Sequence, residues 1–235
     1  PVLPSTVREL AGVPVHEIAR DFGTPTYVYD AEGIAERVQR LSAFDVVRYA
    51  QKASSNLAVL DRVRRAGALV DAVSAGEIHR ALAAGWPAQG DPAPIVYIAV
   101  NCGSTDMIDQ YAARGGRGAL TLRVNPGFGH GHSRKTNTGG PHSKHGIWHE
   151  DLEDALARAA RHGLAVTGLH VHIGSGVDMH HLAQVAEACC ELARRIGPGL
   201  HTISAGGGLP TRYRDDDPEV DVAGYFSVWD AVRER

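Results

Sequence analysis

The sequence predicts an α/β fold, and within that class a (β/α)8 barrel that is incomplete in these 235 residues. Strand-like and helix-like runs alternate along the chain, which is the pattern of repeated βα units. The strand-like runs are apolar, as expected for parallel strands that are covered by helices. No glycine-rich dinucleotide-binding fingerprint follows the first of these strands, which favours the barrel over a doubly wound sheet.

The predicted elements follow one another in a regular order. A short strand and a helix form an N-terminal segment, residues 1–44, which precedes a barrel over residues 45–235. In chain order we expect a strand at 25–29, a helix at 31–41, a strand at 45–51, a helix at 56–66, a strand at 68–73, a helix at 75–84, an apolar run at 95–100, a helix at 104–113, a strand at 119–124, a polar loop at 125–146, a helix at 150–162, a strand at 165–173, a helix at 179–196, a strand at 200–205 and a helix near 219–234.

Two features indicate that the barrel is not whole. The apolar run 95–100 lies where two strands are expected, yet no helix separates them. Parallel neighbours need a crossover of about a dozen residues or more. We therefore expect a break between Tyr97 and Ile98, with roughly 15–20 residues missing. The chain also ends at Arg235 on a helix, without an eighth strand to close the barrel.

The composition narrows the classes of partner. A net charge of −3 with both signs interspersed argues against a nucleic acid or an anionic membrane surface. The longest apolar run, 95–100, is too short to span a bilayer, and the start shows no secretory signal pattern. The three cysteines, Cys102, Cys189 and Cys190, lack a disulfide spacing. A cytoplasmic protein is expected.

Lysine is rare in this chain, and one lysine has a special place. Of the 24 Lys and Arg residues only Lys52, Lys135 and Lys144 are lysines. Lys52 ends the strand-like run 45–51 and opens a loop, and barrel enzymes have their active-site residues at such strand ends. Lysine can lose its proton and attack a carbonyl to form a Schiff base. A solvated loop lysine is the alternative interpretation of Lys52 taken alone.

Two histidines lie on a later strand. His170 and His172 share one face of the strand, because side chains alternate. The pair could bind a metal or fill the barrel interior, but the later strands offer Ser204 and glycines rather than further ligands. We therefore expect no metal site. An imidazole that lies flat on an aromatic cofactor fits better.

A glycine triplet supplies the third element of a cofactor site. Gly206, Gly207 and Gly208 follow the strand 200–205, where backbone N–H groups can approach a phosphate closely. Ser175 could add a hydroxyl to the same phosphate. Arg123 ends the strand 119–124 and could contact a phenolic ring oxygen; an ordinary ion pair fits its spacing equally well. A Schiff-base lysine, a ring partner and a phosphate cradle together predict pyridoxal 5'-phosphate.

Several ordered motifs resemble those of the diaminopimelate decarboxylases, a family of fold-type III pyridoxal-phosphate enzymes related to alanine racemase and ornithine decarboxylase. The resemblance runs from about residue 20 to the end. The motifs are Tyr49-Ala50-Gln51-Lys52-Ala53-Ser54-Ser55-Asn56, Ser74-Ala75-Gly76-Glu77, Leu122-Arg123-Val124-Asn125-Pro126-Gly127, the loop 127–140, Ser143-Lys144-His145-Gly146-Ile147, the segment 170–176 and Gly206-Gly207-Gly208.

The resemblance assigns expected roles to these residues. It implies a Schiff base at Lys52, ring stacking by His172 and a place near the ring oxygen for Arg123. Ser175 and residues 206–208 would hold the phosphate. The resemblance also places Asp71 and Glu77 among acidic positions beside the lysine, and Lys135 and Lys144 in loops near the substrate entrance.

The resemblance also implies the activity, decarboxylation of meso-2,6-diaminopimelate to L-lysine by a homodimer with shared active sites. The family continues into a Glu-Pro-Gly-Arg segment and a β-rich domain, neither of which occurs before Arg235. We therefore expect a chain ending at Arg235 to be inactive. Three alternatives stay open: a single-barrel pyridoxal-phosphate-binding protein without turnover, a decarboxylase of another basic amino acid, and a metal-dependent barrel hydrolase.

Overall fold

A computed structural model of the protein describes residues 7–87, 99–129, 137–176, 178–212, 216–217 and 219–235. The chain divides into two compact units, Pro1–Val96 and Tyr97–Arg235. The expected break between Tyr97 and Ile98 lies outside the described residues and stays a prediction. The domain boundary expected after residue 44 also stays a prediction.

The first unit is built on a pair of parallel strands. Its elements are β1 (Glu9–Leu10), β2 (Val13–Pro14), α1 (Val15–Phe22), α2 (Ala31–Gln39), β3 (Arg48–Ala50), the 3-10 turn η1 (Gln51–Ala53), α3 (Leu57–Arg65), β4 (Leu69–Asp71) and α4 (Ala75–Ala83). Strands β3 and β4 are parallel, with Ala50 opposite Asp71. Val59, Val63 and Ala68 are buried where α3 returns to β4.

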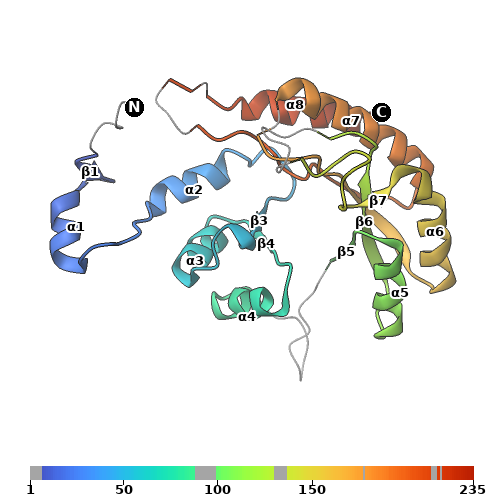
Figure 1. Cartoon of the computed structure of the whole chain (residues 1–235), viewed down its shortest axis with the longest axis horizontal. Coiled ribbons are helices and arrows are strands. Elements are labelled where there is room, and N and C mark those ends of the chain that lie inside the picture. The colour runs from blue at the N-terminus through green and yellow to red at the C-terminus, as the bar shows by residue number, and fades with distance from the viewer. Residues whose placement is uncertain (1–6, 88–98, 130–136, 177, 213–215, 218) are drawn as a thin grey trace. The chain divides into compact units, whose positions relative to one another are not determined.

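The second unit is a parallel sheet covered by helices (Figure 1). Its elements are β5 (Val100–Cys102), α5 (Thr105–Ala113), β6 (Ala119–Asn125), β7 (Ile147–Trp148), the 3-10 turn η2 (His149–Asp151), α6 (Leu152–Arg161), β8 (Ala165–His170), α7 (Met179–Ile196), β9 (Thr202–Ser204) and α8 (Val222–Arg233). The strand order is β5-β6-β8-β9, with β7 paired to the end of β6.

Side-chain alternation gives this sheet two different faces. Leu120, Leu122 and Val124 of β6 are at most 2% exposed and pack under the helices. The residues between them, Thr121 and Arg123, lie on the opposite face. All strands of the sheet are parallel, so their carboxyl ends share one edge. Ligands of parallel α/β folds bind at that edge.

Several predicted bounds are wrong, each for a physical reason. Residues 25–29 form no strand, because an extended segment becomes a strand only when a neighbour pairs with it. The predicted strand 45–51 is limited to β3 because the chain turns into η1 at Gln51. The predicted strand 165–173 ends at His170, where pairing with β6 and β9 stops. Neither the β1–β2 hairpin nor α1 was expected from the sequence.

Candidate active site

Lys52 lies on a tight turn at the carboxyl end of β3. In the 3-10 turn η1 successive side chains point in different directions, so Gln51 is fully buried while Lys52 is exposed. Asp71 is the last residue of β4 and lies opposite Ala50, two residues before Lys52. The first unit thus brings the predicted lysine and the predicted aspartate to one end of its strand pair.

Hydrogen bonds tie the Lys52 turn to helix α4. Gln51 donates through Nε2 to the carbonyl oxygen of Glu77, 2.9 Å away. Ser55 Oγ donates to the carbonyl oxygen of Gln51 at 3.3 Å, and Arg80 Nη1 donates to the carbonyl oxygen of Ser55 at 2.9 Å. The bonds from Gln51 and Arg80 therefore hold the segment carrying Lys52 against α4.

Glu77 has a structural role that accounts for its position. The backbone N–H of Glu77 donates to Ser74 Oγ at 3.2 Å, which caps α4. The Glu77 carboxylate reaches back and accepts from the N–H of Val73 at 2.8 Å. This reciprocal arrangement resembles a capping box, a common way to satisfy helix N-terminal donors. The resemblance placed Glu77 among acidic positions beside Lys52, and the cap was not expected from the sequence.

In the second unit, Arg123 and His170 lie on the polar face of the sheet. Arg123 is opposite His170, which is in turn opposite Ser204. Asn101 of β5 hydrogen-bonds the His170 ring at Nδ1 across β6. Burial lowers the pKa of the Arg123 guanidinium, although not far enough for it to lose its charge at neutral pH. The structure therefore offers a partly desolvated cation at the carboxyl end of β6.

His172 follows β8 and is half-buried against the end of the long polar loop. Its carbonyl oxygen accepts from Thr138 Oγ1 at 3.1 Å, and the next carbonyl, of Ile173, accepts from the Thr138 N–H at 3.0 Å. The returning loop therefore fixes the backbone that carries His172. Ser175 lies three residues further on, exposed in a bend.

The glycine triplet makes a turn that only glycines can adopt. Gly206, Gly207 and Gly208 have φ values of 68°, 80° and 96°. A Cβ on Gly206 would overlap the carbonyl oxygen of Val171, so this residue packs directly against the segment that carries His172. A Cβ on Gly207 would meet nothing within 4 Å. A bare, left-handed turn with one open side is a backbone cradle that fits a phosphate group.

Asn125 closes the long loop, a role that the sequence did not assign to it. It is 4% exposed at the end of β6. Its Nδ2 donates to the carbonyl oxygen of Gly140, and its Oδ1 accepts from the N–H of Gly140, both at 2.9 Å. Oδ1 also accepts from the N–H of Gly127 at 3.2 Å. One buried amide therefore joins both ends of the loop 127–140.

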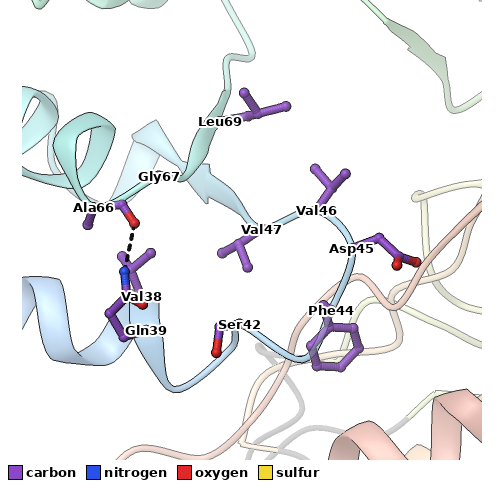
Figure 2. A pocket seen from close by; sticks show the side chains of 10 residues that line it. All are labelled: Val38, Gln39, Ser42, Phe44, Asp45, Val46, Val47, Ala66, Gly67 and Leu69. Carbon is purple, nitrogen blue, oxygen red and sulfur yellow. Dashed lines mark hydrogen bonds between the residues drawn. The ribbon is translucent and has the colours of Figure 1, made fainter.

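A pocket of about 410 Å³ lies at the other end of the first unit's strands (Figure 2). Asp45, Val46 and Val47 precede β3, and Leu69 begins β4, so the pocket is at the amino end of the pair. Gln39 beside it donates to the carbonyl oxygen of Ala66 at 3.0 Å. Lys52 follows the carboxyl end of β3, so this pocket is separate from the predicted chemistry.

The predicted site residues fall into two sets. Lys52 and Asp71 belong to the first unit, and Arg123, His172, Ser175 and residues 206–208 belong to the second. That all of them form one site stays a prediction. Lys144 is exposed, and Lys135 lies outside the described residues. Within the described parts of the chain, no three His, Cys, Asp or Glu side chains gather as metal ligands would.

Comparison with known proteins identifies the family. The profile of the pyridoxal-dependent decarboxylases, pyridoxal binding domain, matches residues 32–114 and 96–235. The chain belongs to this family. Its fold is therefore the α/β barrel domain of the fold-type III enzymes, as the sequence predicted, and the cofactor of the family is pyridoxal phosphate.

Individual relatives point to one branch of the family. The chain is 52% identical to a diaminopimelate decarboxylase of Streptomyces coelicolor over 92% of its own length and 53% of that protein. It is 46% identical to the diaminopimelate decarboxylase of Escherichia coli K12, over 98% of this chain and 59% of that protein. A crystal structure of diaminopimelate decarboxylase has a TM-score of 0.84 at 47% identity, covering 94% of this chain and 56% of that one.

These matches confirm the resemblance, and they also set its extent. The chain spans about half the length of the curated relatives that it matches. None of the helices in the described parts of the chain is both long and apolar enough to cross a lipid bilayer.

Proposed function

We propose that this protein decarboxylates meso-2,6-diaminopimelate to L-lysine with pyridoxal phosphate as cofactor. The observation that carries the proposal is the 46–52% identity to diaminopimelate decarboxylases over 92–98% of the chain. The Gly206–Gly208 turn supports it independently, because its shape suits the phosphate of that cofactor. We further propose that the protein is a homodimer in the cytoplasm. Analytical ultracentrifugation of the whole protein would test the dimer.

Lys52 is the residue that we propose binds the cofactor covalently. It is exposed on a turn that hydrogen bonds hold against α4, so its amine extends from a fixed backbone. In its neutral form that amine can attack an aldehyde. Asp71 ends β4 at the same end of the strand pair.

The second unit supplies the proposed contacts to the rest of the cofactor. The backbone of residues 206–208 and the Ser175 hydroxyl would hold the phosphate, His172 would stack on the ring, and Arg123 would donate to the ring oxygen. When bound, pyridoxal phosphate supplies an electron sink for the pair left on the substrate carbon as the carboxylate departs as CO2. A proton then replaces the lost CO2 on that carbon.

Borohydride trapping tests the role of Lys52. Reduction of the whole protein with bound pyridoxal phosphate should leave a stable label on the Lys52 peptide. Lys52→Arg should lose the label, whereas the control Lys144→Arg should keep it, since Lys144 is an exposed loop residue. Mass spectrometry of the peptides reads the result. A label on Lys144 or Lys135 would show the assignment to be wrong. A wild-type protein that takes the label but releases no CO2 from diaminopimelate would instead be the binding protein without turnover.

The two histidines should separate in a mutational test. His172→Ala should weaken cofactor binding and slow decarboxylation, because it removes the proposed ring contact. His170→Ala should mainly lower thermal stability, because His170 hydrogen-bonds Asn101 within the sheet. Cofactor titration and melting curves of both variants distinguish these effects. The role of His172 fails if its variant binds pyridoxal phosphate as tightly as the wild type.

A further inference from the structure

The Gly206–Gly208 turn rests on a buried tyrosine that the sequence did not single out. Tyr225 lies in the first turns of α8 and is 3% exposed. Its hydroxyl donates to the carbonyl oxygen of Ala205, 3.4 Å away. The backbone of Gly207 lies near the same hydroxyl and acts against the rise in its pKa. One phenol group therefore hydrogen-bonds the residue before Gly206 and lies near the residue after it.

Tyr225 is itself held firmly. Asp221 caps α8 by accepting from the N–H of Gly224 at 2.8 Å. The helix packs along α7 (Figure 1), where Cys190 Sγ lies 3.7 Å from the carbonyl oxygen of Val232. The ring of Tyr225 meets Trp229 edge-on, with centroids 6.4 Å apart at 78°. The hydroxyl therefore stands at a fixed point beside the turn.

The glycine turn needs such support. Three consecutive glycines have the largest backbone freedom of any residues, and they carry no side chains that could pack. Gly206 N–H donates to Ser204 Oγ at 3.3 Å, which holds only the start of the turn. A turn that changed shape freely would lose affinity for an anion, because binding would have to order it first.

We propose that Tyr225 is a positioning residue for phosphate binding, which holds the Gly206–Gly208 turn in the shape that receives the phosphate of pyridoxal phosphate. The inference rests on the proposed function. Burial raises the pKa of Tyr225 to about 12. The hydroxyl thus keeps its proton at physiological pH and stays a donor to the carbonyl oxygen of Ala205.

Removal of the hydroxyl alone tests the proposal. Tyr225→Phe in the whole protein keeps the ring in its packing. The matched control is Tyr111→Phe, because the Tyr111 hydroxyl also donates to a backbone carbonyl, that of Arg117 at 3.1 Å, away from the turn. Dissociation constants are measured by titration with pyridoxal phosphate and with pyridoxal, which lacks the phosphate. Tyr225→Phe should weaken pyridoxal phosphate binding about 3–10-fold and leave pyridoxal unchanged. Tyr111→Phe should change neither.

The possible outcomes separate this inference from the function on which it rests. If Tyr225→Phe weakens both ligands equally, or neither, the positioning role is wrong while the proposed function stands. If the wild type binds no pyridoxal phosphate, or binds it no more tightly than pyridoxal, the proposed cofactor site fails and the inference with it.

A second measurement covers the case in which Tyr225→Phe does not fold. In wild-type protein labelled with 15N-glycine, the amide proton of Gly207 should exchange slowly with solvent, because the proposal places it against the buried Tyr225 hydroxyl. Exchange as fast as that of an unstructured glycine would overturn the proposal.

Discussion

At the scale of single residues, buried side-chain amides hydrogen-bond the backbone near the predicted site. Gln51 is fully buried, and its Nε2 must face Glu77, because a carbonyl oxygen can only accept. Among the described residues its Oε1 has no hydrogen-bond partner. Such a group is retained at a cost in stability of about 1–3 kcal/mol. Its benefit is therefore expected in the placement of Lys52 rather than in stability.

Gln51→Met should separate placement from stability. Methionine fills a similar volume without polar atoms, so the melting temperature should change little. The rate of borohydride-trapped labelling of Lys52 should fall several-fold, because the turn loses its bond to α4. Gln39→Met is the control, since Gln39 also donates to a backbone carbonyl but lies at the amino end of the strands. Equal labelling in both variants would argue against this role of Gln51.

Asn125→Ala should be strongly destabilising. It removes three hydrogen bonds and leaves the polar backbone of the buried Gly140 without its partner. We expect a loss of about 2–4 kcal/mol in the free energy of unfolding. Asn56→Ala removes the exposed cap of α3 and should cost only about 1 kcal/mol. Urea unfolding of the whole protein measures both. Equal losses would mean that water replaces the Asn125 amide.

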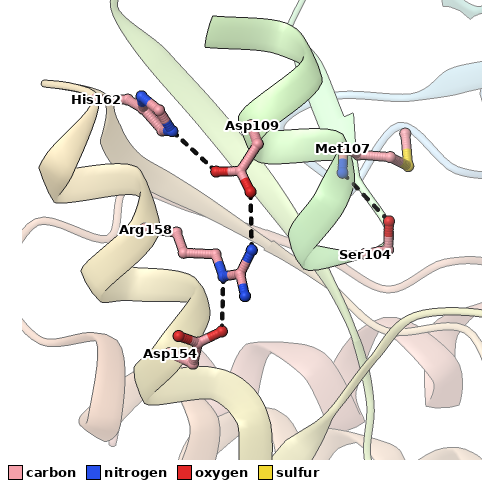
Figure 3. A network of polar contacts seen from close by, with 6 residues as sticks. All are labelled: Ser104, Met107, Asp109, Asp154, Arg158 and His162. Atoms are coloured by element: carbon pink, nitrogen blue, oxygen red, sulfur yellow. Dashed lines mark hydrogen bonds and ion pairs between the residues drawn. The ribbon is translucent and has the colours of Figure 1, made fainter. Parts of the chain in front are cut away.

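At the scale of elements, charged side chains join the outer helices of the second unit (Figure 3). Asp109 on α5 contacts Arg158 of α6 and His162 at its end, each at 2.8 Å. Arg158 also pairs with Asp154 at 2.8 Å. The hydrogen bond from His162, aided by Arg158, lowers the pKa of the Asp109 carboxyl. These helices cover the apolar face of the sheet, so the network acts on the scaffold and not on the site.

Asp109→Asn should lower the melting temperature near neutral pH but not at low pH. The pKa of the Asp109 carboxyl is lower in the folded protein than in the unfolded chain, where it is about 3.9. The ionised carboxylate therefore stabilises the fold at pH values above about 3.9, and this contribution disappears as pH falls through the folded pKa. The difference from wild type should therefore vanish once pH has fallen through the folded pKa of Asp109. Asp61→Asn is the control for an ion pair that joins no two helices. The pKa of the Asp61 carboxyl is also lowered, but its partners Arg64 and Arg65 lie on the same helix as Asp61. A pH-independent difference for Asp109→Asn would contradict the electrostatic account.

At the scale of the whole molecule, buried acidic groups make stability depend on alkaline pH. Burial raises the pKa of the Cys102 thiol and of the Cys189 thiol, the latter aided by Cys190. Both thiols are fully buried. Tyr225 adds a buried phenol to this group. These groups stay protonated in the folded protein after their counterparts in the unfolded chain have ionised.

The free energy of unfolding should accordingly fall as pH rises above about 8.5. The folded state then binds more protons than the unfolded state, so stability declines with a slope of about 1.4 kcal/mol per pH unit for each such thiol. Urea unfolding between pH 7 and pH 10.5 measures the slope, and the double variant Cys102→Ala, Cys189→Ala should flatten it. A profile that is flat to pH 10.5 in the wild type would show that the thiols ionise in the folded protein.

Local sequence by itself determined the alternation of strands and helices, the parallel fold, the family and the place of Lys52 at a strand end. These features can be predicted from apolar periodicity, helix caps and glycine turns, because each of these patterns spans only a few neighbouring residues. It could not reveal the functions of Gln51, Asn125 and Tyr225, because their partners Glu77, Gly140 and Ala205 lie 15 to 26 residues away along the chain. Only the tertiary structure brings such groups together, since a buried polar atom finds its partner through folding and not through spacing. For the same reason the sequence did not reveal that the Glu77 carboxylate accepts from the backbone N–H of Val73.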